Sequence, residues 1–441
     1  MAVLGKRTFL VGLAVLLCHG SGFAQQQATP AVVTVIRAGT LIDPRLNEPK
    51  HDQLIIIRGD RIESVDDVAS RQVPTNATVI DLSNSTVLPG LIESHAHIVD
   101  TGEFPDAGLY DEQLLKFPLA YRVVRATVAI RIALGQGITT IRDVHTEGAG
   151  YSDIGIKRAV EEGYIPGPRI VACTRGISST GAYGLYGFAP EIEVPKGVQV
   201  IDGPVEARKA TREQLDHGAD CIKAFVTNDR VRFDPKGNLF SPTSLTLEEL
   251  KAIVEEAHGW HRKVACHAYM GDGVHRALDA GCDSIEHGVG LDDSAIAQMK
   301  AQGTFLVPTL LLFRIDWGRP GVPIEQAAAS LHEQSFKKAM AAGIKIAFGT
   351  DVGSFDWGGS TMEAEELGYY VKFGMSPINA IRTATLNAAE LLDMPGKIGV
   401  IAPGAYADII AVRGNPLLDI TELQRVKFVM KNGSVFKKEL E

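Results

Sequence analysis

The pattern of hydrophobic positions divides the chain into three parts. Residues 32–86 contain short segments of alternating apolar and polar residues, bounded by Gly, Asn, Asp or Pro, which is typical of β-strands joined by turns. Residues 396–436 return to this pattern and include Asn432-Gly433, a pair that favours a hairpin turn. The pattern predicts that strands from both chain ends form one small β-sandwich domain.

The middle of the chain, residues 87–395, alternates short apolar runs with amphipathic segments such as 204–218 and 246–261. The apolar runs are VLPGLIESHAHI, GITTIRDV, PRIVACT, DCIKAFVT, KVACHAY, DSIEHG, TFLVPTL and KIAFGTD. Eight buried strands that alternate with helices predict an α/β fold, namely a (β/α)8 TIM barrel.

The first residues differ from the rest of the chain. Lys6 and Arg7 precede the apolar run TFLVGLAVLLCHGSGFA, which is too short for a stable membrane anchor and is followed by polar residues. We therefore expect residues 1–24 to be a signal peptide that is cleaved after Ala24. The mature protein would be exported, either periplasmic or secreted, and would not be held at a membrane.

Composition and charge narrow the class of partner. The chain has 441 residues, of which 45% are hydrophobic and 22% charged, as in ordinary globular proteins. The net charge is −9 and the Lys and Arg residues are scattered, so the sequence shows no basic surface for nucleic acid. We expect a small-molecule substrate, no nucleic-acid partner and a homo-oligomer.

Four cysteines remain after the predicted cleavage: Cys173, Cys221, Cys266 and Cys282. None forms a Cys-x-x-Cys pair, which argues against a zinc finger. Most lie in or beside apolar strand-like runs, where a buried thiol is the usual explanation. An exported protein can also form disulfides, but the sequence does not assign a pairing.

Polar side chains end several of the predicted strands. His95 and His97 are two residues apart at the end of the first strand, so both imidazoles face the same side. Lys223 lies in the fourth run, His267 in the fifth, His287 in the sixth and Asp351 at the end of the eighth. Because active sites of such barrels lie at the carboxyl ends of the strands, these six residues should converge. Imidazole nitrogens and a carboxylate suit zinc or a similar divalent ion.

Lys223 does not fit this ligand set as an ordinary ammonium, because a cation cannot bind a metal ion. It becomes a ligand if its amine reacts with carbon dioxide to form a carbamate, whose two oxygens can bridge two metal ions. Burial near metal ions lowers the pKa of a lysine and favours the free amine that this reaction needs.

The pattern of these six residues resembles the amidohydrolase superfamily in its binuclear form with a carboxylated lysine. The resemblance extends from the N-terminal β unit through VLPGLIESHAHI to PGAYADIIAV near the C-terminus. The chain is most similar to exported prolidase-like or imidazolonepropionase-like amidohydrolases, and it also resembles the ochratoxin-degrading members. One departure is Glu93, where many relatives have aspartate.

The resemblance implies a role for each candidate. His95, His97 and Asp351 would hold the more buried metal ion, and His267 and His287 the outer one. N6-carboxylated Lys223 would bridge two divalent ions, most simply Zn²⁺, together with a hydroxide. Asp351 would be the catalytic residue that takes the hydroxide proton and returns it to the leaving nitrogen. The implied activity is hydrolysis of the amide bond of dipeptides or N-acyl amino acids.

The loops after the strands should select the substrate. Residues 175–200 are rich in Gly and aromatic residues, which suits either a mobile lid or an ordered loop, and Phe313, Trp317, Phe355 and Trp357 should lie near the rim. Candidate groups for a substrate carboxylate are Tyr269, which is two residues after His267, then His145, Arg142 and Arg314. Arg142 has an alternative role as an ion-pair partner in the barrel wall, and Arg314 as part of a loop salt bridge.

Two other functions remain open at this stage. A mononuclear deaminase or cyclic-amide hydrolase, such as an imidazolonepropionase, does not require a bridging lysine, so Lys223 argues against it. A non-enzymatic barrel that serves as a scaffold ranks lower, because such proteins tend to lose ligands and this chain retains all six.

Overall fold

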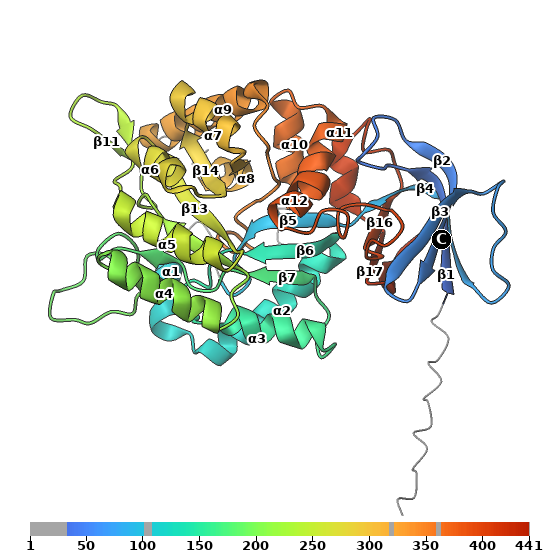
Figure 1. Ribbon diagram of the computed structural model, residues 1–441, viewed down its shortest axis with the longest axis horizontal. Helices are drawn as coiled ribbons and strands as arrows, with labels where there is room; N and C mark the ends of the chain where they lie inside the picture. The colour runs from blue at the N-terminus through green and yellow to red at the C-terminus, as the bar shows by residue number, and fades with distance from the viewer. Residues whose placement is uncertain (1–32, 101–107, 317–321, 359–362, 441) are drawn as a thin grey trace, which may run out of the picture. The chain divides into compact units, whose positions relative to one another are not determined.

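The structure is a computed structural model that describes residues 33–100, 108–316, 322–358 and 363–440 (Figure 1). The predicted signal peptide and Trp317 lie outside these residues. Among the helices described, none combines the length and the apolar character that a membrane crossing requires.

Both ends of the described chain contribute to one seven-stranded sheet, with the order β18-β17-β16-β4-β1-β2-β3. Its strands are β1 (Val33–Leu41), β2 (Lys50–Arg58), β3 (Arg61–Asp67), β4 (Thr78–Pro89), β16 (Ile409–Val412), β17 (Phe428–Lys431) and β18 (Ser434–Lys438). Strand β4 joins the two ends, because it pairs in parallel with β1 and antiparallel with β16. Strands from both ends of the chain therefore share one sheet. The pairing gives a single sheet and does not establish a sandwich of two sheets.

The middle of the chain forms two parallel sheets. One contains β5 (Leu91–Ala96), β6 (Ile138–Asp143) and β7 (Arg169–Ala172). The other has the order β15-β14-β13-β10-β8-β9. Its strands are β8 (Ile177–Ser178), β9 (Gln199–Val200), β10 (Cys221–Phe225), β13 (Lys263–Met270), β14 (Ser284–Gly290) and β15 (Phe305–Val307). Most of these strands are buried along their whole length, as expected for a parallel sheet covered on both faces.

The two parallel sheets are connected by hydrogen bonds on two sides. On one side, residues 345–352 connect β15 to β5 through single hydrogen bonds, among them Ala347 N to Leu306 O at 2.9 Å and His97 N to Val352 O at 2.8 Å. On the other side, Asp220 N donates to Ala172 O at 2.8 Å. The predicted parallel α/β arrangement is therefore confirmed, but the described strands do not form a closed eight-stranded barrel. Among the described residues, irregular backbone takes the place of the eighth strand.

Helices follow most of the parallel strands. They are α1 (Gly108–Lys116), α2 (Leu119–Gly135), α3 (Ser152–Glu161), α4 (Pro204–Asp216), α5 (Leu247–Gly259), α6 (Asp272–Ala280), α7 (Asp293–Gln302), α8 (Leu310–Asp316), α9 (Pro323–Ala342), α10 (Glu365–Lys372), α11 (Pro377–Arg382) and α12 (Ala388–Leu391). The predicted helices near 204–218 and 246–261 are present as α4 and α5. Helix α5 begins at a capping box formed by Thr246 and Glu249. Pro118 separates α1 from α2, because proline disfavours helical backbone in the residue before it.

The four cysteines form two disulfides instead of remaining buried thiols. Cys173 pairs with Cys221, and Cys266 pairs with Cys282. The first disulfide connects the residue after β7 to the first residue of β10, beside the hydrogen bond from Asp220 to Ala172. It therefore fixes the start of the strand that carries Lys223.

Candidate active site

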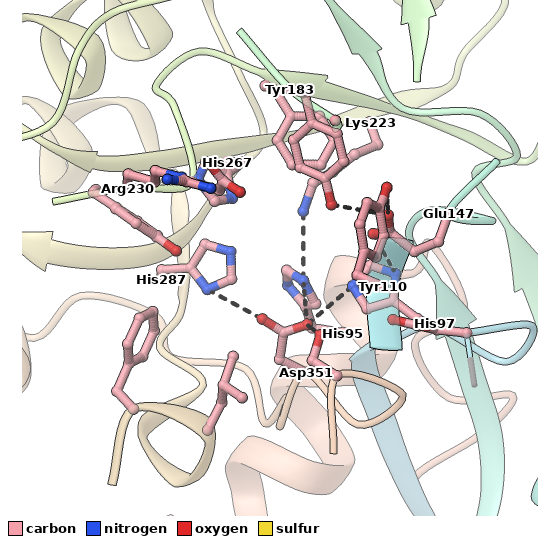
Figure 2. A pocket seen from close by; sticks show the side chains of 18 of the residues that line it. His95, His97, Tyr110, Glu147, Tyr183, Lys223, Arg230, His267, His287 and Asp351 are labelled. Carbon is pink, nitrogen blue, oxygen red and sulfur yellow. Dashed lines mark hydrogen bonds and ion pairs between the residues drawn. The ribbon is translucent and has the colours of Figure 1, made fainter. Parts of the chain in front are cut away.

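The six predicted residues come together around one cavity (Figure 2). They lie on four different strands or directly after them, except for Asp351, which lies in the irregular segment beside β5. Asp351 Oδ1 is 2.9 Å from His97 Nε2 and 3.7 Å from His95 Nε2, and its Oδ2 is 3.7 Å from His287 Nδ1. Lys223 Nζ is 3.4 Å from His95 Nε2. The His267 ring stands 4.6 Å from the His287 ring, measured between centroids.

The backbone at Asp351 is unusual, and this conformation brings its carboxylate to the histidines. Asp351 has φ = +66° and His287 has φ = +72°, in the left-handed region that residues other than glycine seldom occupy. Gly353, two residues later, packs so closely on β5 that a Cβ atom would overlap the carbonyl oxygen of His97. Strained backbone of this kind persists only where the surrounding structure holds it, and it clusters at functional sites.

Three of the histidines are held in the neutral form that binds metal ions. Burial, together with the nearby Lys223, lowers the pKa of His95 to about 4 and lowers that of His267 well below its ordinary value. Burial and the neighbouring imidazoles do the same to the pKa of His287. His267 Nε2 is buried and has no hydrogen-bond partner in the described part of the chain, which is costly unless a ligand occupies its lone pair.

His97 and Lys223 differ from these three in their charge. Burial acts to lower the pKa of His97, but the hydrogen bond and charge of Asp351 raise it to about 10. Burial acts to raise the pKa of Asp351, but the charge of His95 and the hydrogen bond and charge of His97 hold it well below its ordinary value. Burial lowers the pKa of Lys223 to about 8 against the attraction of Glu286 and Asp351. A divalent cation would replace the proton shared by His97 and Asp351, so this donor set fits a metal ion.

A second layer of hydrogen bonds orients the imidazoles. His95 Nδ1 contacts Glu286 Oε2 at 2.6 Å, and His97 Nδ1 donates to the carbonyl oxygen of His145 at 2.8 Å. His287 Nδ1 lies 2.8 Å from the hydroxyl oxygen of Thr309. In each case the other ring nitrogen, Nε2, takes no part in these outer contacts. Such outer contacts are typical of histidines that bind metal ions.

Glu93, the residue that departs from the family pattern, lies behind the cavity. Its carboxylate accepts hydrogen bonds from the backbone N–H groups of His95, at 2.7 Å, and Thr350, at 3.0 Å. It therefore fastens the irregular segment to strand β5. The longer side chain of glutamate supports the backbone of the site.

The cavity has a volume of about 480 Å³. Of the four predicted substrate-binding residues, all of which the structure describes, only Tyr269 lines it. Arg142 pairs with Glu286 at 2.8 Å, its alternative role, and Arg314 pairs with Glu333 at 2.9 Å. The ring nitrogens of His145 contact Glu147 at 2.7 Å and the carbonyl oxygen of Gly197 at 3.0 Å. Of the predicted rim residues, Phe313 lines the cavity, whereas Phe355 and Trp357 do not.

Several lining residues were missed by the sequence analysis, notably Tyr110, Glu147, Tyr183, Asp229 and Arg230. Tyr110 comes from helix α1. The other four come from the loops after β6, β8 and β10, where no periodic pattern fixes the direction of a side chain. Their only signal was position after a strand end, which many residues share.

Glu147, together with His97 and His145, forms a second group with metal-ligand geometry besides His95, His97 and Asp351. Hydrogen bonds already account for this second group. His97 Nδ1 is engaged by a carbonyl oxygen, and His145 contacts Glu147. Burial acts to raise the pKa of Glu147, but the charge of His145 and the hydrogen bond from it lower the pKa to about 2. Glu147 is therefore an ionised hydrogen-bond acceptor.

This arrangement of a parallel α/β fold and clustered histidines, a lysine and an aspartate agrees with the comparisons to known proteins. The chain belongs to the amidohydrolase family, whose model matches residues 86–436. It is therefore a hydrolase that acts on carbon–nitrogen bonds, in a family that generally uses divalent metal ions.

Individual relatives agree with the family. Ochratoxinase of Aspergillus niger is 31% identical over 439 residues, which cover 92% of this chain and 87% of the relative. A crystal structure of a Xaa-Pro dipeptidase with bound methionine has a TM-score of 0.82 and 32% identity, covering 92% of this chain and 100% of that chain. Imidazolonepropionase of Nocardia farcinica is 25% identical, over 84% of this chain and 88% of the relative.

Proposed function

We propose that this protein hydrolyses the amide bond of dipeptides or N-acyl amino acids, and that it does so with two divalent metal ions, most simply Zn²⁺. The observation that carries the proposal is the convergence of His95, His97, Lys223, His267, His287 and Asp351 on one cavity. The similarity to a Xaa-Pro dipeptidase and to ochratoxinase supports this substrate class.

We divide the six residues into one set of ligands for each proposed metal ion. His95, His97 and Asp351 would hold one ion, and His267 and His287 the other, with N6-carboxylated Lys223 between them. The unpartnered Nε2 of His267 and the lowered pKa of Lys223 support these assignments. When bound, the two ions would lower the pKa of water and polarise the scissile carbonyl group.

The protein's own groups have separate tasks in this proposal. Asp351 is ionised, so its carboxylate can accept a proton at Oδ1 or Oδ2 and later donate it to the leaving nitrogen. That proton is needed because an amine anion is a poor leaving group. Tyr269, which lines the cavity beside His267 with ring centroids 4.5 Å apart, is placed to contact the substrate.

A cyclic-amide hydrolase or deaminase with one metal ion is the second candidate, and the similarity to imidazolonepropionase favours it. The decisive experiment is to load the mature protein with zinc and to count the metal ions per chain. The same preparation is then assayed with dipeptides, N-acyl amino acids, lactones and cyclic imides. Two ions with release of a free amino acid would support our proposal. One ion, with release of ammonia or ring opening of an imide, would overturn it.

The bridging role of Lys223 is tested separately. We expect Lys223→Ala to lose activity and to regain part of it with added formate or acetate, because a small carboxylate can take the place of the carbamate. Lys223→Arg is the matched control, since it retains a cation but cannot be carboxylated. Unchanged activity of Lys223→Ala would remove the bridge from the mechanism.

We also propose that the protein is exported, periplasmic or secreted, after cleavage of residues 1–24. The two disulfides support this location, because such bonds persist in oxidising compartments. N-terminal sequencing of protein from cell fractions would test the cleavage site. A homo-oligomer stays a prediction, which light scattering of the purified protein would check.

A further inference from the structure

Glu147 connects three separate parts of the chain at the wall of the cavity (Figure 2). Its Oε1 atom accepts a hydrogen bond from His145 Nδ1 at 2.7 Å. Its Oε2 atom accepts one from the hydroxyl of Tyr110 at 3.0 Å and one from the hydroxyl of Tyr183 at 2.8 Å. Both oxygens are therefore engaged by the protein itself.

The position of Glu147 is fixed by its backbone as well. Glu147 has φ = +46°, a left-handed conformation that is unfavourable for a residue with a side chain. The buried guanidinium of Arg122 donates from Nη2 to the carbonyl oxygens of Glu147, at 2.8 Å, and Thr146, at 3.1 Å. Strained backbone that is held in this way indicates a place where a precise geometry matters.

The contacts of Glu147 and its partner His145 reach both ends of the loop 179–198, which follows β8. Tyr183 lies near the start of this loop and bonds to Glu147. Gly197 lies near its end, and its carbonyl oxygen is 3.0 Å from His145 Nε2. Gly197 also packs so tightly that a Cβ atom would overlap the hydroxyl of Tyr110. Both ends of the loop are therefore anchored by direct contacts in this conformation.

The anchored loop places the ring of Tyr183 against Phe225 of strand β10, which in turn packs on the candidate ligand His267. The Tyr183 and Phe225 rings are 4.4 Å apart, and the Phe225 and His267 rings are 4.9 Å apart, measured between centroids. Because the hydroxyls of Tyr110 and Tyr183 donate to Glu147, the two tyrosines offer the cavity mainly the surfaces of their rings.

We propose that Glu147 is a positioning residue that holds the loop 179–198 and the aromatic wall of Tyr110, Tyr183 and Phe225 in place for the substrate. The inference rests on the proposed amide hydrolysis. The wall would pack against an apolar group of the substrate. In Figure 2, Glu147 and Tyr110 lie across the cavity from Arg230 and His287.

The main test is Glu147→Gln. Glutamine keeps the shape of the side chain, but one carboxylate oxygen becomes an NH₂ group. This group is a donor, so it cannot accept the hydrogen bond that a tyrosine hydroxyl or the His145 N–H donates to Glu147. We expect KM to rise about tenfold for substrates with a bulky apolar group, because hydrogen bonds to a charged acceptor are lost. We expect a smaller change in kcat, little change in KM for substrates with small groups, and faster hydrogen exchange of residues 179–198.

Two other variants sharpen this test. Tyr183→Phe retains the ring but loses one hydrogen bond to Glu147, so it should show a smaller shift in the same direction. Glu422→Gln is the matched control, because Glu422 also accepts hydrogen bonds, from Gly414 and Arg425, but lies outside the loop and is not among the residues that line the cavity. It should leave KM and the exchange of residues 179–198 unchanged. If Glu147→Gln does not fold, Tyr183→Phe combined with Tyr110→Phe provides the same measurements.

A purely structural role of Glu147 would lower the melting temperature and leave KM and loop exchange unchanged, and that result would overturn the proposal. Equal exchange of residues 179–198 in wild type and Glu147→Gln would also overturn it. If the protein hydrolysed no amide at all, the exchange measurement would still report on the loop. Failure of the proposed function is thereby distinguishable from failure of the positioning role.

Discussion

The imidazole of His95 and the carboxylate of Glu286 form a buried pair in which Nδ1 and Oε2 are 2.6 Å apart. Glu286 directly precedes His287 on strand β14, so the two side chains leave the strand in opposite directions. His287 faces the cavity, whereas Glu286 reaches His95 and is held there by Arg142 at 2.8 Å. One strand thus supplies both a candidate ligand and the group that orients another.

Replacing Glu286 should weaken metal binding without removing any ligand. We expect Glu286→Gln to lower the affinity of the mature protein for zinc by about 10- to 100-fold, because His95 loses its charged partner. Competition with a chromophoric chelator measures this change. Glu256→Gln is the matched control, because Glu256 also pairs with arginines, Arg208 and Arg212, but lies on α5 away from the cavity. Equal affinities in both variants would contradict the orienting role.

A second prediction concerns Glu363, which is buried and whose two carboxylate oxygens have no hydrogen-bond partner among the described residues. Burial raises its pKa from 4.5 to about 7. Above pH 4.5 the unfolded chain releases this proton while the folded protein keeps it up to about pH 7, so the free energy of unfolding falls across that interval.

Glu363→Gln removes this penalty. We expect the variant to gain stability over wild type by up to about 3 kcal/mol at pH 8, and much less at pH 4.5. Urea unfolding at the two pH values measures the difference. A stability difference that is the same at both values would show that Glu363 does not titrate in this way.

The sequence predicted the fold best where the backbone is regular. The period of apolar residues predicted the strands and the helices α4 and α5, because burial on one face imposes that period. It did not predict that residues 345–352 would be irregular. That segment is held by contacts with residues far away in the sequence, among them the hydrogen bond from His97 N to Val352 O.

Some residues of the candidate site could likewise be predicted from the sequence, and others could not. Positions at strand ends were enough to predict that His95, Lys223 and Asp351 would converge, because parallel strands share one carboxyl edge. They were not enough for Arg142 and His145. The charged partner of Arg142 is Glu286 on another strand, and the ring of His145 is engaged by Glu147 and by the loop 179–198. Contacts between distant segments are not encoded in any local pattern.

The disulfides lead to a third prediction, which concerns stability. The bond between Cys173 and Cys221 spans 48 residues, and that between Cys266 and Cys282 spans 16. We expect the Cys173→Ser/Cys221→Ser variant to lose about 2–4 kcal/mol of unfolding free energy. The Cys266→Ser/Cys282→Ser variant should lose somewhat less, because a shorter closed loop restricts the unfolded chain less. Chemical denaturation of oxidised protein measures both. If dithiothreitol did not change the wild-type midpoint, the assigned bonds would be absent.

The last prediction concerns Arg230, which is the only arginine among the described residues that line the cavity. Its guanidinium lies 4.4 Å from the centre of the Tyr186 ring, near Asp229. If the substrate is a dipeptide or an N-acyl amino acid, its free carboxylate should be attracted to this cation. We expect Arg230→Gln to raise KM about tenfold for such a substrate and to leave KM nearly unchanged for the corresponding primary amide, which carries no charge.

Arg232→Gln is the control for this measurement, because Arg232 is exposed on the short strand β11 (Arg232–Phe233) and is not among the residues that line the cavity. If the arginines act only through long-range attraction of the substrate, both variants should raise KM for the free acid alike, and added salt should screen this effect. A direct contact would instead make Arg230→Gln selective for the free acid at high salt as well. If the acid and its amide responded equally to Arg230→Gln, the carboxylate would have to bind elsewhere in the cavity, with Tyr269 as the next residue to replace.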